Sequence, residues 1–212
     1  MSSVFTTPLG DIWVSNGQAE AILDGCIKVA ERQGLSGPVV EFLREHMTTS
    51  GMGCYGFNIE CPPFDEPAHR VLLSQLIAEL TNVAAAGGLR ELVDVPWDEL
   101  AFWIQVDWLA SLELLHDGIR ASLPMGMIPT LQVKLDTHYR DAIDVHRLLV
   151  RTTPLRILRD GQLAEDRIRS EIELRRQAIR ILDRLPEDLQ AAFGDELRAE
   201  VDVLEGRREH SR

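Results

Sequence analysis

The segment from Asp65 to Gly88 constrains the fold most, because it carries a complete set of helix signals. Asp65-Glu66-Pro67 is typical of a helix start, where proline and acidic side chains are favoured. Apolar side chains then recur at helical spacing until the Gly87-Gly88 pair, which is typical of a helix end; they are Val71, Leu72, Leu76, Leu80 and Val83. The pattern predicts an amphipathic helix that must bury its apolar side against other elements.

Helical spacing recurs along most of the chain, which predicts a mostly α fold with a helical bundle-like core. Further helical patterns start near Gln18, Ser36 and Asp136. The apolar segment 97–123 fits a helix and, over part of its length, the alternation of a strand. Because neither glycine nor proline interrupts residues 97–117, we expect a helix there.

The C-terminal part carries charged amphipathic patterns that predict two helices, 162–185 and 186–204. We expect them to pair as an antiparallel C-terminal helical hairpin, because each has an apolar stripe to bury. The side chains expected to face inward are Ile168, Ile172, Ile179, Leu182, Leu189, Phe193, Leu197 and Val201.

Two segments predict a minor β contribution. Residues 4–14 contain two β-prone runs about a turn at Pro8-Leu9-Gly10, which indicates an N-terminal hairpin. Residues 52–60 combine glycines with aromatic side chains and Ile59, which indicates a loop that enters a short strand.

Acidic charge is concentrated in the first part of the chain. Residues 1–150 contain nine Lys or Arg and 20 Asp or Glu, whereas residues 151–212 contain 13 and 14. The composition changes after Thr152-Thr153-Pro154, and a proline disrupts a helix interior. We therefore expect an acidic, mainly helical core domain over 1–155, with the helical hairpin over 156–212 packed on it.

The composition of these 212 residues, 45% hydrophobic and 26% charged, is typical of a soluble globular protein. A formal net charge of −12 repels phosphate, so nucleic acid is not the expected ligand. The three cysteines form no CxxC pair, which favours reduced thiols. Since neither a secretory signal nor an apolar run of membrane-spanning length is found, we expect a cytoplasmic protein without a membrane partner.

The loop Gly51-Met52-Gly53-Cys54-Tyr55-Gly56 matches the pattern of dinucleotide-binding loops, G-x-G-x-x-G. Such a loop needs a strand before it and a helix after it, and neither is predicted here. A turn is the favoured interpretation, and no cofactor is expected. Cys54 within the loop is a candidate nucleophile if a histidine lies beside it, with an inert thiol as the alternative.

Two segments, Glu66-Pro67-Ala68-His69 and Glu113-Leu114-Leu115-His116, have the spacing E-x-x-H. Residues three apart share one face of a helix, and carboxylate-bridged metal sites use this pair. His138 and Asp141 would complete a site with Glu113 and His116 if their helices pack together. These four residues are the candidate metal ligands.

The segment Arg140-Asp141-x4-His146 resembles the R-x4–6-H motif of the HEPN superfamily. The resemblance implies an all-helical, often dimeric protein, so a homodimer is one expectation. In some members the two motif residues act in metal-independent RNA cleavage. Carried over to this chain, Arg140 would stabilise phosphate charge and His146 would act as general acid or base.

Trp97, Trp103 and Trp108 lie within twelve residues of one another. Large aromatic side chains at helical spacing bury much apolar area, so we expect them in the core. An aromatic ligand wall or a partner-binding patch is the alternative.

The acidic charge and the lack of a strong catalytic motif favour a protein–protein interaction module over an enzyme. Such a module would bind a basic partner by electrostatic complementarity, as acidic inhibitor and immunity-type proteins do. The alternative is a small helical enzyme, either metal-dependent through Glu113, His116, His138 and Asp141 or HEPN-like through Arg140 and His146.

Overall fold

The computed structural model describes residues 2–49, 55–129, 133–152, 165–190 and 194–210. The chain forms two compact units, Met1–Leu135 and Asp136–Arg212, which we call the N-terminal and C-terminal units and describe separately. Most described residues are helical, so the mostly α prediction with a minor β contribution is confirmed. Within the described ranges, no helix is both long and apolar enough to span a membrane.

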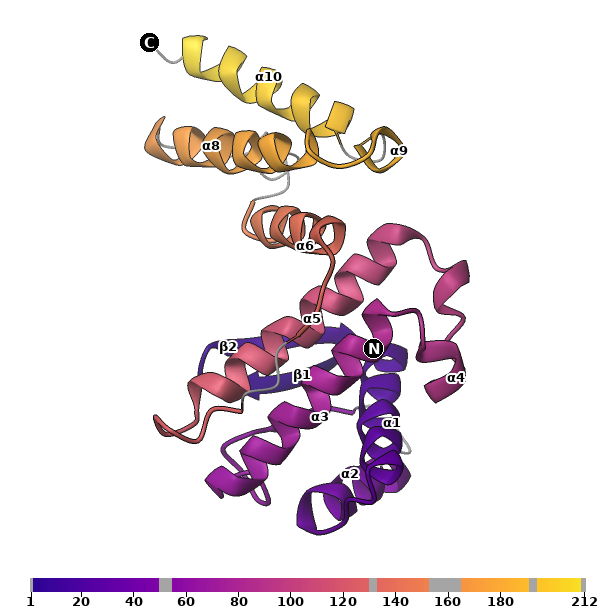
Figure 1. Ribbon diagram of the computed structural model, residues 1–212. Helices are drawn as coiled ribbons and strands as arrows, with labels where there is room; N and C mark the ends of the chain where they lie inside the picture. The colour runs from indigo at the N-terminus through magenta and orange to yellow at the C-terminus, as the bar shows by residue number, and fades with distance from the viewer. Residues whose placement is uncertain (1, 50–54, 130–132, 153–164, 191–193, 211–212) are drawn as a thin grey trace. The chain divides into compact units, whose positions relative to one another are not determined.

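The N-terminal unit combines a small sheet with helices (Figure 1). Its elements are β1 (Ser2–Thr7), β2 (Gly10–Ser15), α1 (Asn16–Arg32), α2 (Pro38–Thr49), β3 (Phe57–Asn58), α3 (Pro67–Ala85), α4 (Leu89–Val93), the 3-10 turn η1 (Trp97–Glu99) and α5 (Phe102–Ala121). The predicted hairpin, short strand and helix after Pro67 are therefore present. The short helix α4 was not predicted.

The sheet has the strand order β2-β1-β3, so β1 is central. β1 and β2 are antiparallel, with Val4 opposite Trp13, whereas β3 is parallel to β1, with Phe57 opposite Phe5. Gly56 leads into β3 at a point where a Cβ atom would overlap the Val4 carbonyl oxygen. Glycine is therefore required for this close approach of the two main chains.

Helix α5 packs on α3 and on the hairpin β1–β2. Close to the C-terminal end of α5, a Cβ atom at Gly118 would overlap the side chain of Thr7. The missing side chain lets the helix backbone come directly against the turn end of the hairpin. Successive side chains of a strand point to opposite faces of the sheet. Phe5 of β1 and Val14 of β2 lie on the inward face and are buried in the core of this unit.

The helix predicted over 97–123 begins later than expected, at Phe102. Trp97 lies in η1, and the chain is extended at Leu100 before α5 starts. The side-chain amide of Gln105 donates to the carbonyl oxygens of Trp97 and Leu100, at 2.8 and 3.1 Å. These bonds satisfy acceptors outside the helix and stabilise the break, which explains why uninterrupted apolar sequence does not make one helix.

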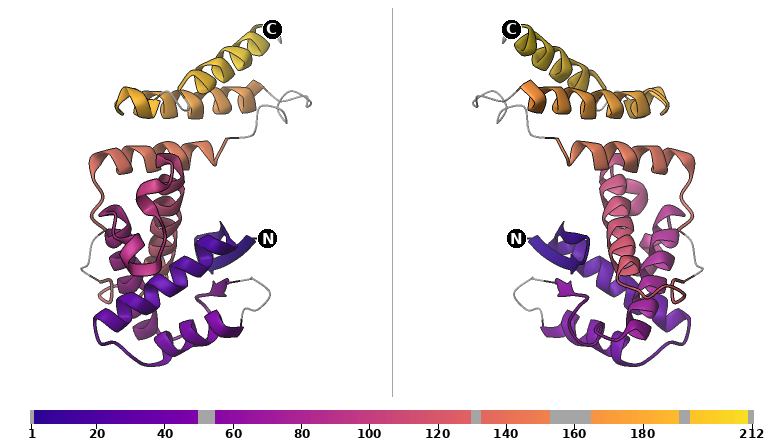
Figure 2. Two further views of the ribbon diagram at one scale, coloured as in Figure 1. Left: turned by 90° about the vertical axis from the view of Figure 1, so that its right-hand side faces the viewer. Right: turned by 90° about the vertical axis from the view of Figure 1, so that its left-hand side faces the viewer.

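The C-terminal unit consists of α6 (Thr137–Leu149), α8 (Glu165–Leu182), α9 (Glu187–Gln190) and α10 (Gly194–His210) among its described residues. Helix α6 starts as predicted, with the Asp136 carboxylate accepting a hydrogen bond from the Tyr139 amide at 2.9 Å. Helices α8 and α10 lie side by side and run in opposite directions, and α6 also packs on α8 (Figures 1 and 2). By its contacts α6 groups with the hairpin, and the two compact units divide before Asp136.

The core between α8 and α10 contains Ile168, Ile172, Val201 and Leu204, with Ile179 packed against it. Leu182 and Leu197 are also buried, as predicted. Of the other expected inward positions, Phe193 lies outside the described residues, and the side chain of Leu189 is not described.

Replacing Ile172 with aspartate should lower the free energy of unfolding by about 3 kcal/mol or more, because it buries a carboxylate in this apolar core. Ser170→Asp adds the same charge at an exposed position of α8 and serves as the control. Chemical denaturation of both variants measures the difference. Equal stability of the two would show that the α8–α10 core is wrongly placed.

Candidate binding groove

The N-terminal unit contains a groove of about 430 Å³ between the end of β2 and the first half of α5. Two parts of the chain distant in sequence form it: the hairpin with the first turn of α1 that directly follows it, and helix α5. The lining residues are Ser2, Trp13, Val14, Ser15, Gln18, Ile104, Asp107 and Trp108. The volume is within the lower part of the range of about 300–1,000 Å³ that is usual for ligand pockets.

Half of the residues that line the groove are apolar. Trp13 is 65% exposed and Ile104 is 48% exposed, although both are large apolar residues. Trp108 is buried and packs edge-on against Trp97, with ring centroids 6.1 Å apart. Trp108 therefore belongs to the core, as expected, and also lines the groove.

Gln18 supplies a buried polar group at the groove wall. The Ser15 hydroxyl oxygen caps α1 by accepting a hydrogen bond from the Gln18 amide at 3.2 Å, which fixes the position of Gln18. The Gln18 residue is only 5% exposed, and its Nε2 has no hydrogen-bond partner within the described residues. Leaving such a donor unsatisfied costs about 1–3 kcal/mol, so an acceptor supplied from the groove would be favourable.

The candidate metal ligands are divided between the two units. Glu113 and His116 lie on α5, whereas His138 and Asp141 lie on α6. Asp141 accepts a hydrogen bond at 2.9 Å from Arg184, which follows the end of α8, and His138 is exposed. Across the described ranges, no three His, Cys, Asp or Glu side chains gather closely enough to hold a metal ion. The metal-dependent alternative stays a prediction.

His116 is a buried histidine whose Nε2 has no hydrogen-bond partner among the described residues. Burial lowers the pKa of its imidazole below the ordinary value of 6.5. The Arg120 guanidinium lowers this pKa further, and Asp117 opposes the shift. His116 is therefore neutral at neutral pH and behaves as a residue of the helix interior.

The other catalytic candidates are placed as follows. Arg140 and His146 both lie on α6, with Arg140 exposed and His146 half-buried. Six helical positions separate their Cα atoms by about 9 Å along the axis and by roughly 120° around it. Cys54 lies outside the described residues. The HEPN-like and cysteine-based alternatives stay predictions.

Cys26 and Cys61 show the two environments of the described cysteines. Cys26 is buried in α1, and burial raises the pKa of its thiol to about 12. A thiol with so high a pKa is not a nucleophile at neutral pH. Cys61 is exposed and forms no disulfide.

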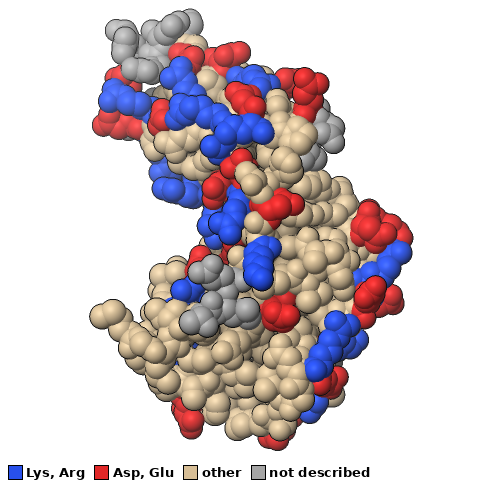
Figure 3. All heavy atoms as spheres, in the orientation of Figure 1, with Lys and Arg blue, Asp and Glu red and all other residues tan. Residues whose placement is uncertain are grey.

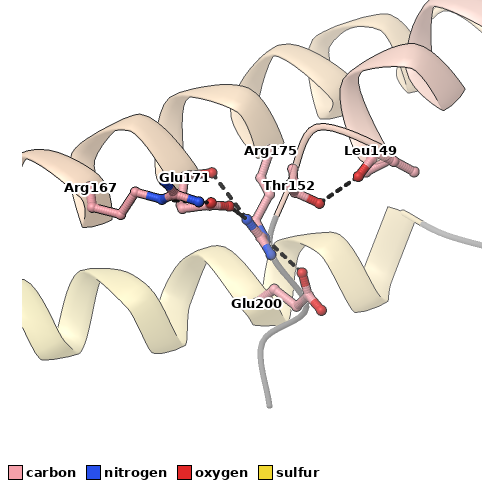
Figure 4. A network of polar contacts seen from close by, with 6 residues as sticks. All are labelled: Leu149, Thr152, Arg167, Glu171, Arg175 and Glu200. Atoms are coloured by element: carbon pink, nitrogen blue, oxygen red, sulfur yellow. Dashed lines mark hydrogen bonds and ion pairs between the residues drawn. The ribbon is translucent and has the colours of Figure 1, made fainter. Parts of the chain in front are cut away.

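A buried charge network in the C-terminal unit has no counterpart in the sequence predictions (Figure 4). Arg175 is 1% exposed and lies beside the apolar core of α8 and α10. Its Nη1 donates to Glu171 Oε2 and its Nε donates to Glu200 Oε2, both at 2.7 Å. The exposed Arg167 lies 3.5 Å from the second Glu171 oxygen, so cations and carboxylates alternate along the network.

Sequence reasoning missed Trp13, Gln18 and Ile104. For Trp13 a signal was present, because Ile12 and Val14 take the inward positions of β2 and leave Trp13 on the outer face. No local pattern marks Gln18 or Ile104, since each becomes notable only when α1, α5 and β2 meet at the groove.

Arg175→Met should lower the free energy of unfolding by about 3 kcal/mol, because it removes the cation that lies 2.7 Å from the buried Glu171. The neighbouring Arg176 forms an exposed ion pair with Glu205, so Arg176→Met should cost less than about 1 kcal/mol. Urea unfolding of both variants tests the contrast. Similar losses for the two would contradict the burial of Arg175.

Acidification should destabilise the fold through His116. Because its pKa is lowered in the folded state, protons bind preferentially to the unfolded chain. The contribution is fully present above the unfolded pKa of about 6.5 and is lost as the pH falls below that value. Melting temperatures measured from pH 7.5 to 5 should fall less steeply in His116→Leu than in the wild type. The exposed His138, changed to glutamine, is the control for the removal of a histidine.

Comparison of the chain with protein-family models, with curated proteins and with solved structures finds no match in any of the three. The function must therefore be argued from the charges and from the groove itself. Both of these features belong to the N-terminal unit.

Proposed function

We propose that the chain acts by binding a basic protein, and that its N-terminal unit provides the attracting surface. The observation that carries this proposal is the division of charge between the units. The N-terminal unit contains seven Lys or Arg and 17 Asp or Glu, a net charge of −10. The C-terminal unit contains 15 and 17, a net charge of −2.

The charges of the C-terminal unit are largely neutralised by their neighbours. Four arginines in and between α8 and α10 pair with carboxylates of the same unit; they are Arg176 with Glu205, Arg180 with Glu173, Arg184 with Asp141, and Arg198 with Asp183. On the face shown in Figure 3, blue and red side chains accordingly lie next to one another in this unit. Neighbouring opposite charges cancel at a distance, so this unit contributes little long-range field.

The N-terminal unit has too few cations to cancel its carboxylates. Lys28 and Arg44 are engaged by Asp24 and Glu31, and Arg90 pairs with Asp98 and Glu99. Most of the 17 carboxylates therefore remain as excess negative charge. An excess of this kind speeds the approach of a basic protein and disfavours acidic partners and nucleic acids.

The test is the rate of association with a partner captured from the native host. A variant that neutralises three exposed carboxylates of the N-terminal unit, Glu20→Gln, Glu41→Gln and Asp65→Asn, should associate several-fold more slowly at low salt. The matched control neutralises three exposed carboxylates of the C-terminal unit, Glu187→Gln, Glu196→Gln and Asp202→Asn, and should change the rate little. Raising the salt concentration should slow the wild type and abolish its advantage over the first variant.

Two results would contradict the proposal. One is that no protein partner is captured. The other is that a captured partner associates at rates that neither salt nor the N-terminal substitutions change. Loss of an enzymatic turnover in Arg140→Ala or His146→Ala would instead support the enzyme alternative.

A further inference from the structure

We propose that the groove beside β2 receives an extended segment of the basic partner, which pairs with the free edge of β2 and places apolar side chains against Trp13 and Ile104. The inference rests on the proposed function, because it specifies where the partner binds and with what chemistry. Four independent features of the N-terminal unit support it: the strand edge, the exposed apolar pair, the unsatisfied amide and the charge.

The edge of β2 offers main-chain groups for pairing. The Thr6 carbonyl accepts a hydrogen bond from Ile59 at 3.2 Å, on the β3 side, so the main-chain groups of Thr6 point away from β2. In an antiparallel pair, hydrogen-bonded and non-hydrogen-bonded positions alternate. Asp11 lies opposite Thr6, and Trp13 follows two positions later. The N–H and C=O groups of Asp11 and Trp13 therefore point to the outer edge, where no described strand pairs with β2.

The apolar side chains lie where a partner strand would place its own. Trp13 belongs to β2 itself, and Ile104 faces the groove from α5. The alternating side chains of an added strand would lie beside these two residues and cover both of them. Peptides that add a strand to a sheet edge gain affinity from main-chain bonds and selectivity from pockets of this kind.

Gln18 is the feature that points most directly to a ligand. Its Nε2 is buried at the groove wall without a partner in the described structure, whereas the Ser15 cap holds the Gln18 main chain in place. A rotation of the side chain that turned this amide into the groove would let it donate to a carbonyl oxygen of the peptide. Buried polar groups are nearly always hydrogen-bonded, and among the residues that line the groove Gln18 has such an unsatisfied atom.

The negative charge of the N-terminal unit favours a basic peptide as the occupant of the groove. Asp107 lines the groove, Asp11 lies on the same strand as Trp13, and the whole unit carries a net charge of −10. A second copy of the chain could pair through the same edge, but it would bring an equal negative charge to the contact. A segment with Lys or Arg beside its apolar residue meets no such repulsion.

The experiment selects ligands for the full-length chain from a phage-displayed library of random peptides long enough to span β2. The enriched sequences should alternate apolar residues with other residues and contain Lys or Arg. Synthetic versions should bind Trp13→Ala and Ile104→Ala about tenfold more weakly than the wild type. Leu9→Ala is the control, because Leu9 is 68% exposed at the turn of the same hairpin but outside the groove.

Two further measurements distinguish strand pairing from nonspecific apolar binding of the peptide. Two peptides are compared, each methylated at one of the two alternating sets of main-chain nitrogens. Only one set donates hydrogen bonds to β2, so one peptide should lose binding and the other should keep it. Gln18→Leu should keep or raise the melting temperature, since it removes an unsatisfied donor, and should still weaken peptide binding.

The proposal is overturned if no basic, apolar peptide is enriched, or if the enriched peptides bind the Trp13 and Ile104 variants as well as the wild type. It is also overturned if the chain dimerises in solution and Trp13→Ala abolishes the dimer, because a second copy then occupies the edge. A captured host partner that binds Trp13→Ala normally would remove this inference and leave the proposed function intact. If basic peptides bind at the groove but no host partner is captured, the peptide site is supported and the proposed function is contradicted.

Discussion

The contact between α5 and the N-terminal hairpin is the constraint on which the candidate groove depends. Gly118 lets the helix backbone come against Thr7 at the turn end of the hairpin. From that point α5 extends toward the other end of β2, where Asp107 and Trp108 lie beside Val14. The close contact at Gly118 fixes how α5 lies against the hairpin, and the groove forms at the other end, between the first half of α5 and the end of β2.

The packing of β2 against the helices explains why the side chain of Trp13 stays exposed next to the core. The inward face of β2 is used by Ile12 and Val14 against the helices. Strand geometry then forces Trp13 to the outer face, so it cannot join the core without a shift of register that would expose Val14. The fold therefore holds a tryptophan at the surface beside a buried one, and binding can use the first without disturbing the second.

Local signals in the sequence predicted the elements well and the groove poorly. The first turns at Pro67 and Asp136 could be recognised because a helix start depends on residues adjacent in sequence. The start of α5 could not, because Gln105 stabilises it through carbonyl groups of the preceding loop. Gln18 and Ile104 acquire their roles only through tertiary packing. Arg175 was overlooked because a buried arginine depends on Glu200, which lies on another helix.

The network around Arg175 also bears on how the C-terminal helices find one alignment. An apolar stripe alone tolerates sliding, because aliphatic side chains pack acceptably against many neighbours. A displacement of α10 along α8 by one turn would carry Glu200 about 5.4 Å away from Arg175 while the guanidinium stayed buried. The salt bridge therefore destabilises any alignment of α10 along α8 in which Glu200 no longer reaches Arg175. The exposed arginines of α8 and α10 could pair with several different carboxylates and so do not fix the alignment of the two helices. The buried pair of Arg175 and Glu200 favours one alignment.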